Sequence, residues 1–266
     1  MSVTIAIALV LIGLLAGTLG SLVGLGGGFL IVPLLSLLFT LPSREVAGTS
    51  TAVVLVTAAS STLAYLRLKR IDLKSGWLFA VVSIPGAFIG ADFSHMMPTH
   101  DFDLSFGIFL IIVSVFLLLR PDNDSRQVIR GHSRRVLEDA QGNHYDYAFF
   151  LPIGLIAGFF VGFLSSLFGI GGGTVMVPVM VLLLGFPAAI ATATSMFMIL
   201  VSSVIGTASH AILGDIRWLD AVALAIGAFL GGRIGPLIAR RLTGKWLLRT
   251  LAVVMIATAA RMIWTA

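Results

Sequence analysis

The sequence predicts an all-α polytopic membrane protein built from two inverted repeats. Three observations lead to this class. Of the 266 residues, 58% are hydrophobic and only 11% are charged, whereas an average soluble domain is about 25% charged. Long apolar runs alternate with short polar joints. A glycine-rich motif also occurs once in each half: residues 17–34 read GTLGSLVGLGGGFLIVPL, and residues 162–179 read GFLSSLFGIGGGTVMVPV.

Each half contains five apolar segments, which gives about eight to ten membrane segments. The runs lack the period-two alternation of a transmembrane barrel. The second segment of each half has only about 13 residues, while a spanning helix needs about 20. It is therefore either a half-helix that enters the membrane or part of a longer unwound unit. The segments are 3–23, 29–41, 46–66, 75–97 and 103–119 in the first half, and 148–168, 174–186, 188–212, 218–239 and 246–264 in the second.

The polar stretch 120–147 divides the chain into a first transmembrane repeat, residues 1–119, and a second, residues 148–266. The apolar run 3–16 has the composition of a signal peptide, but no Lys or Arg precedes it. A similar segment also occurs internally at 148–168. We therefore interpret the first run as a membrane helix.

Positive charge predicts the orientation, because cytoplasmic joints of membrane proteins are rich in Lys and Arg. Basic residues gather at 67–74, in the linker 120–147 and at 240–249, whereas 92–103 has three Asp and no Lys or Arg, and 214–217 has one Arg. Equivalent joints thus lie on opposite sides, which makes the repeat inverted. We expect a multi-pass protein of the bacterial plasma membrane, with both termini outside and the linker in the cytoplasm.

The duplication extends beyond the glycine motif. Thr49-Ser50 recurs 145 positions later as Thr194-Ser195. Further along, GAFIGA at 86–91 matches GAFLGG at 227–232 with an offset of 141, which would make Asp92 and Arg233 equivalent.

The glycine clusters predict an anion site at membrane depth. Glycines unwind the helix, and the next short helix begins with unpaired N–H groups and a positive dipole end. Serine and threonine hydroxyls could add donors, or they could cap helices or bond to their own helix. Pro33 and Pro178 are candidate hinges. The candidate substrate-binding residues are Gly24, Gly26, Gly27, Gly28, Thr49, Ser50, Gly169, Gly171, Gly172, Gly173, Thr194 and Ser195.

Each functional interpretation of these residues has a structural alternative. The glycines spaced four apart, such as Gly13 and Gly17, favour close helix packing. Three ionisable residues, Asp92, Arg233 and His210, are candidates for gating or coupling. For the first two the alternative is a side chain that reaches the nearer membrane interface, and for His210 it is a structural role.

Other function classes lack support in the sequence. There are no cysteines, which excludes disulfides and thiolate chemistry. No P-loop lysine follows the glycines and no residues have metal-ligand spacing, so we expect no cofactor and no metal. The net charge of +5 lies mostly in the joints and does not indicate nucleic-acid binding. Ser165, Ser166 and His210 would allow an intramembrane hydrolase, but no acidic partner supports a triad.

The paired motifs GSLVGLGGGFLIVPLL and SSLFGIGGGTVMVPVM, each followed by a proline and a Thr-Ser pair, resemble the signature of the TauE/SafE sulfite exporter family. The resemblance implies a permease for sulfite, thiosulfate, sulfonates or related small anions. Its functional residues would be the glycine clusters, their prolines and the Thr-Ser pairs. We expect a secondary transporter in the lipid bilayer that works by alternating access around a midplane site, with protons or sodium as the candidate coupling ions. A passive anion channel and a carrier of non-sulfur carboxylates are the alternatives.

Overall fold

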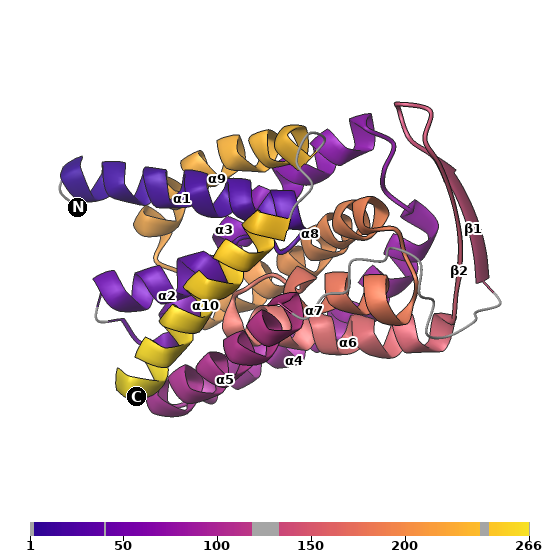
Figure 1. Cartoon of the computed structure of the whole chain (residues 1–266). Coiled ribbons are helices and arrows are strands. Elements are labelled where there is room, and N and C mark those ends of the chain that lie inside the picture. The colour runs from indigo at the N-terminus through magenta and orange to yellow at the C-terminus, as the bar shows by residue number, and fades with distance from the viewer. Residues whose placement is uncertain (1–2, 40, 119–132, 240–244, 266) are drawn as a thin grey trace.

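The computed structural model describes residues 3–39, 41–118, 133–239 and 245–265, and most of these lie in helices (Figure 1). Within these ranges six helices are long and apolar enough to cross a membrane, which confirms the predicted class. The first repeat contains α1 (Val3–Val23), α2 (Gly28–Leu38), α3 (Ser43–Arg67), α4 (Leu73–Met96) and α5 (Thr99–Leu118). The second contains α6 (Leu151–Phe168), α7 (Gly173–Pro178), the π-helical turn η1 (Val179–Leu183), α8 (Ala188–Leu213), α9 (Trp218–Ala239) and α10 (Lys245–Thr265).

Proline and glycine fix equivalent helix ends in the two repeats. Pro42 and Pro187 precede α3 and α8 with φ of −56° and −58°, because proline has no N–H to lose at a helix start. Helix α1 is followed by Gly24 at φ +85°, and α6 by Gly169 at φ +69°. This left-handed conformation ends a helix at little cost only when the residue is glycine.

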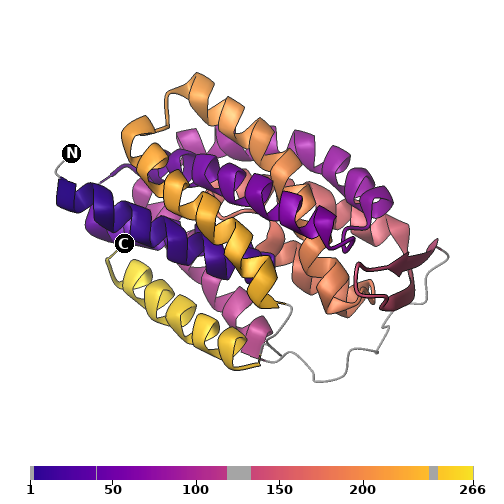
Figure 2. The same ribbon diagram turned by 90° about the horizontal axis from the view of Figure 1, so that it is seen from above.

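Each repeat packs its helices against those of the other repeat, and the two repeats are related by a pseudo-two-fold axis. Helix α1 packs along α9 of the other repeat, and α6 packs along α4 (Figures 1 and 2). The equivalent helices α3 and α8 contact each other, as do α5 and α10. The core is therefore built mainly between the repeats rather than within each one.

Glycines set the register of these interfaces. A Cβ on Gly17 would lie 2.7 Å from the carbonyl oxygen of Ala228, and a Cβ on Gly162 would clash with that of Ser83. The two pairs are equivalent, because Gly162 follows Gly17 by 145 positions and Ala228 follows Ser83 by the same number. Helix backbones approach this closely only where side chains are absent, so the packing interpretation of these spaced glycines is confirmed.

The same register corrects one expectation. Gly86 packs against Phe159, and Gly231 packs against Leu14, so the 145 offset continues through α4 and α9. The match of 86–91 to 227–232 at 141 is wrong by one helical turn, because glycines recur every four residues along both helices. Asp92 and Arg233 are therefore not equivalent.

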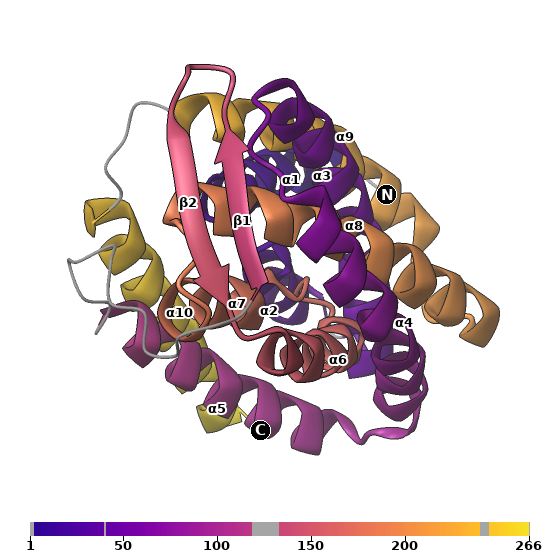
Figure 3. The ribbon, with the colours of Figure 1, turned by 90° about the vertical axis from the view of Figure 1, so that its right-hand side faces the viewer.

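The linker contains a β-hairpin that the sequence analysis did not predict. Strands β1 (Ser133–Glu138) and β2 (His144–Phe149) pair antiparallel, from Ser133 opposite Phe149 to Glu138 opposite His144. The hairpin lies across the helix ends on the side opposite to both termini (Figures 1 and 3).

Polar contacts fasten the hairpin to the joint between α3 and α4. Arg70 Nη2 lies 3.0 Å from Asp139 Oδ2, and the Tyr147 hydroxyl donates to Asp72 Oδ2 over 2.8 Å. Burial opposes the ionisation of Asp139, but hydrogen bonds from Asn143, Gln141 and Arg70 hold its pKa well below the usual range. The linker is therefore an ordered part of the fold in residues 133–149.

The ends of the molecule agree with the charge pattern. The basic joint 67–74 meets the hairpin, whereas the joints 92–103 and 214–217 meet each other through His95 and Asp215. The predicted inside and outside joints thus form two separate groups. Arg120, Arg126, Arg130, Arg240 and Arg241 lie outside the described residues.

Labelling of single cysteines tests which end faces the cytoplasm. The chain has no cysteine, so His144→Cys in the hairpin and His100→Cys at the opposite end each report one position. We expect a membrane-impermeant maleimide to label His100→Cys in intact cells and His144→Cys only after permeabilisation. The reverse pattern would mean that the protein is oriented the other way.

Candidate functional site

The two glycine breaks meet in the interior of the protein. Residues 24–28 and 169–173 are buried, and a Cβ on Gly26 would lie 3.4 Å from the Cα of Gly171. A Cβ on Gly28 would clash with Gly169, and one on Gly173 with Gly24. The two copies of the motif are therefore placed face to face, although 145 positions separate them in the chain.

Each break is followed by a separate half-length helix. Helix α2 has 11 residues, while α7 has 6 and continues into the 5 residues of η1. At about 1.5 Å per residue, neither spans a membrane. Pro33 lies inside α2 without ending it, whereas Pro178 ends α7 at the start of the π-helical turn. The hinge role proposed for these prolines stays a prediction.

Backbone donors are left free where the half-helices begin. Within the described residues, the N–H groups of Gly27, Gly28 and Phe29 make no hydrogen bond, and neither do those of Gly172, Gly173 and Thr174. The first N–H groups of any helix lack intrahelical partners, and the dipole adds positive potential there. Both half-helices thus present donors near the meeting point of the breaks.

The predicted serines connect the two breaks to the opposite repeats. Ser50 Oγ donates to Gly169 O over 2.5 Å, and Ser195 Oγ donates to Gly24 O over 2.8 Å. In this structure the two hydroxyls therefore satisfy carbonyls of the breaks rather than facing a free site.

The predicted threonines occupy a second symmetric position. Thr49 Oγ1 accepts from the N–H of Arg217, and Thr194 Oγ1 accepts from the N–H of Asp72, each over 3.0 Å. They hold the joints that lead into α9 and α4. These contacts are neither caps nor bonds within the threonine's own helix, because each threonine accepts from backbone of the opposite repeat.

Close packing also explains part of the glycine clusters. A Cβ on Gly27 would lie 2.7 Å from Ala16 O, and a Cβ on Gly172 would clash with Val161. These glycines let each break fold back against its own preceding helix. Gly26 and Gly171 differ, because they face the opposite break.

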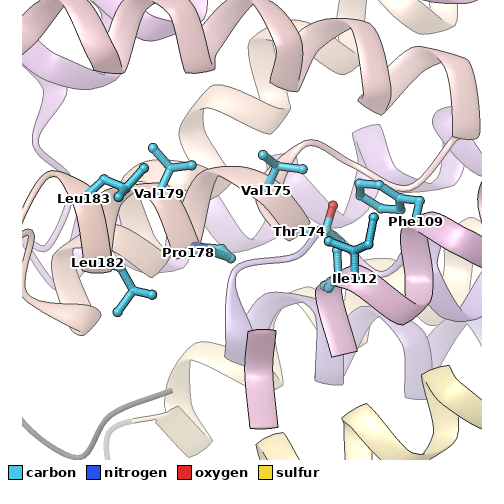
Figure 4. Close-up of a pocket in the computed structure, with 9 residues that line it drawn as sticks. Phe109, Ile112, Thr174, Val175, Pro178, Val179, Leu182 and Leu183 are labelled. Carbon is cyan, nitrogen blue, oxygen red and sulfur yellow. The ribbon is translucent and has the colours of Figure 1, made fainter. Parts of the chain in front are cut away.

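Thr174 combines burial with an unpartnered hydroxyl. Its side chain is fully buried on the first turn of α7, and within the described residues its Oγ1 has no hydrogen-bond partner. It also lines an apolar pocket of about 250 Å³ between α5 and α7–η1, together with Phe109, Ile112 and Pro178 (Figure 4). Sequence reasoning missed Thr174, because the equivalent position in the first repeat is Phe29.

The three candidates for gating or coupling have different surroundings. Asp92 and Arg233 are exposed on α4 and α9, and the Arg233 guanidinium carbon lies 4.6 Å from the centre of the Phe229 ring. These positions suit side chains that reach toward an interface. His210 is fully buried on α8.

His210 belongs to a polar cluster that the sequence did not reveal. Its Nδ1 lies 3.3 Å from Asp215 Oδ2, and its Nε2 lies 3.0 Å from the carbonyl oxygen of Ser166. His95 Nδ1 lies 3.0 Å from Asp215 Oδ1. Burial opposes the ionisation of Asp215, but hydrogen bonds from His210 and His95 hold its pKa below the usual range.

Asp215 is an acidic partner of His210, which corrects the expectation that none exists, but the other contact of His210 weighs against a hydrolase. A nucleophilic serine needs its hydroxyl within hydrogen-bond reach of the base. His210 bonds to the Ser166 carbonyl oxygen rather than to its hydroxyl. The arrangement therefore does not form a serine–histidine pair.

Comparisons with known proteins agree with this architecture. The family described as "Sulfite exporter TauE/SafE" matches residues 9–262. The chain is 43% identical to the probable membrane transporter protein YunE of Bacillus subtilis, covering 97% of each chain. It is 28% identical to the probable membrane transporter protein YfcA of Escherichia coli K12, over 92% of this chain and 84% of that protein. No solved structure matches significantly.

Alanine substitution tests the bonds between the breaks. Ser50→Ala leaves the buried Gly169 carbonyl without its donor, so we expect a loss of about 1–3 kcal/mol in unfolding free energy. Ser114→Ala is the matched control, since this buried serine bonds only to Leu110 O of its own helix. Unfolding of the purified protein in detergent measures both. Equal effects of the two substitutions would contradict a special role for Ser50.

Proposed function

Because the chain belongs to the TauE/SafE sulfite exporter family of membrane transporters, we propose that it is a secondary carrier for a small sulfur-containing anion such as sulfite, thiosulfate or an organosulfonate. It works in the bacterial plasma membrane by alternating access, with the substrate bound where the two glycine breaks meet. The meeting of these breaks, with free N–H groups on both sides, is the observation that carries the proposal.

The chemistry at the breaks suits a dehydrated oxyanion. Sulfite and sulfonate groups present several oxygens, each of which can accept hydrogen bonds from backbone N–H groups. In the described chain, the side chains in direct contact with the breaks belong to uncharged residues such as Val54, Thr192 and Ile199. Two half-helix N-termini directed at one place add positive potential without a fixed cation.

Reliance on dipoles rather than on a buried Lys or Arg has a functional advantage. A full ion pair in a low-dielectric interior binds an anion tightly and slows its release. Backbone donors give weaker and more graded attraction, which suits a carrier that must release its substrate on the opposite side.

Burial of the breaks supports a carrier over a passive channel. Residues 24–28 and 169–173 are covered by protein, and the bonds from Ser50 and Ser195 tie each break to the opposite repeat. Substrate access then requires that these contacts separate on one side while they hold on the other. A passive channel and a carrier of carboxylates are the competing functions.

The second break leads directly to a pocket. Thr174 borders the apolar pocket, whereas its equivalent, Phe29, fills the same place with a buried ring. The π-helical turn η1 follows α7 but has no counterpart in α2, and such turns often occur at functional sites. We assign the first contact with substrate to this side.

Flux measurements in proteoliposomes test the function. Purified protein should show saturable uptake of labelled sulfite, thiosulfate or methanesulfonate and should support counterflow, in which internal unlabelled anion accelerates uptake. Empty liposomes are the control. Flux without saturation or counterflow would favour the channel, and transport of acetate in place of all three sulfur anions would favour the carboxylate carrier.

Thr174→Val tests the site itself. Valine keeps the shape but removes a hydroxyl that has no partner, so the protein should be as stable or more stable by about 1 kcal/mol. Anion affinity in a thermal-shift titration should nevertheless fall roughly tenfold, since a hydrogen bond to a charged group is lost. Thr62→Val is the control, because Thr62 Oγ1 is also buried without a partner in the described chain. Equal affinities of the two variants would remove Thr174 from the site.

A further inference from the structure

His210 lies between two hydrogen-bond acceptors. Its Nε2 faces the Ser166 carbonyl oxygen at 3.0 Å, and its Nδ1 faces the Asp215 carboxylate at 3.3 Å. A neutral imidazole carries one N–H, whereas the imidazolium carries two. When Asp215 is ionised, both of these groups are acceptors. The two contacts are then both favourable only if the His210 ring carries two protons.

Loss of this proton would break one of the two contacts. Either tautomer of neutral His210 turns a nitrogen lone pair toward an oxygen lone pair, at Asp215 or at Ser166. The Ser166 side matters most for transport, because Ser166 lies three residues before Gly169 at the end of α6. The protonation of His210 is thereby linked to the helix that leads into the second break.

The equivalent position in the first repeat cannot respond in the same way. Tyr65 stands 145 residues before His210, and its hydroxyl donates to Ser21 O over 2.9 Å. Ser21 is the equivalent of Ser166, so the same anchor exists in both repeats. A tyrosine hydroxyl keeps its proton near neutral pH, so only the anchor in the second repeat is titratable.

A route for the proton to the aqueous side is present. The His95 side chain is 34% exposed and bonds to Asp215, which lies on the joint after α8. Arg44 of α3 approaches Asp215 Oδ1 at 3.9 Å, with half of its side chain exposed. Arg217 is paired with Asp220 of α9 at 2.8 Å. Of these two arginines, Arg44 is the one whose side chain approaches the cluster.

We propose that the His210–Asp215–His95 cluster is the proton-binding site that couples substrate movement to the proton gradient. The proposal rests on the proposed carrier function and identifies its coupling ion. In the protonated state, His210 holds the end of α6 and keeps the second break closed. The Nδ1 proton leaves through Asp215 and His95 to water, and the remaining proton then moves from Nε2 to Nδ1, beside the ionised carboxylate. Nε2 now turns a lone pair toward the Ser166 carbonyl oxygen, which releases Ser166 and allows the break to open.

Protonation can be measured without any substrate. In the full chain labelled with ¹⁵N-histidine and purified in detergent, the signals that disappear in His210→Gln belong to His210. Because both nitrogens face acceptors, we expect a state of the protein in which both ring nitrogens of His210 carry protons. The exposed His144 is the internal reference. A single protonated nitrogen on His210 throughout about pH 5 to 8 would overturn the proposal.

Coupling is measured with sulfite in proteoliposomes. A pH gradient should drive accumulation by the wild type, and the ratio of gradient-driven uptake to sulfite exchange should fall about tenfold in His210→Gln. If that variant fails to fold, His95→Gln is measured instead, and it should also lower the ratio. His144→Gln is the control and should keep the wild-type ratio.

An unchanged ratio in the folded variants, or sulfite transport by the wild type that ignores the pH gradient, would overturn the coupling role. Wild-type protein that moves no sulfite, thiosulfate or methanesulfonate would instead overturn the proposed function, and the histidine spectra would still decide whether the cluster binds the proton.

Discussion

The structure depends on one constraint: unwound backbone inside a membrane protein needs partners, because neither water nor lipid tails can supply them there. The two glycine breaks meet this need jointly. Gly24 O and Gly169 O accept the hydroxyls of Ser195 and Ser50, each from the other repeat. Neither break is complete without the opposite half of the chain. The free N–H groups that remain are then the feature a substrate can use.

The symmetry conserves backbone contacts and varies the side-chain chemistry. Equivalent positions hold Tyr65 and His210, both bonded to equivalent carbonyls. Asp72 and Arg217 are also equivalent, and each donates its N–H to a threonine. The duplicated frame thus carries two different sets of charges. A single substrate site can be shared while gating and coupling are divided between the repeats.

The features that could be predicted from the sequence are those that depend on nearby residues. The apolar segments, the short second helices and the separation of basic from acidic joints all followed from composition and length. The hairpin was missed because its two six-residue strands lie in a charged linker, where a short alternating pattern is a weak signal. The alignment of α4 with α9 at an offset of 141 was wrong, because both helices have a glycine every four residues. Such sequences still align when one is shifted by four residues, which is about one helical turn. The contacts of Asp215 with His95 were beyond reach, since 120 residues separate them.

The parallel packing of α1 and α9 bears on how the protein is made. Helix α6 follows its partner α4 in the chain and can pair with it as soon as it enters the membrane. Helix α1 must wait until about 200 further residues have been synthesised, which takes roughly 10–40 s at 5–20 residues per second. During that time the face with Gly13 and Gly17 has no α9 to contact. The first helix therefore depends on lipid or on the insertion machinery for longer than any helix of the second repeat, and mutations on this face should act during biogenesis as well as in the finished protein.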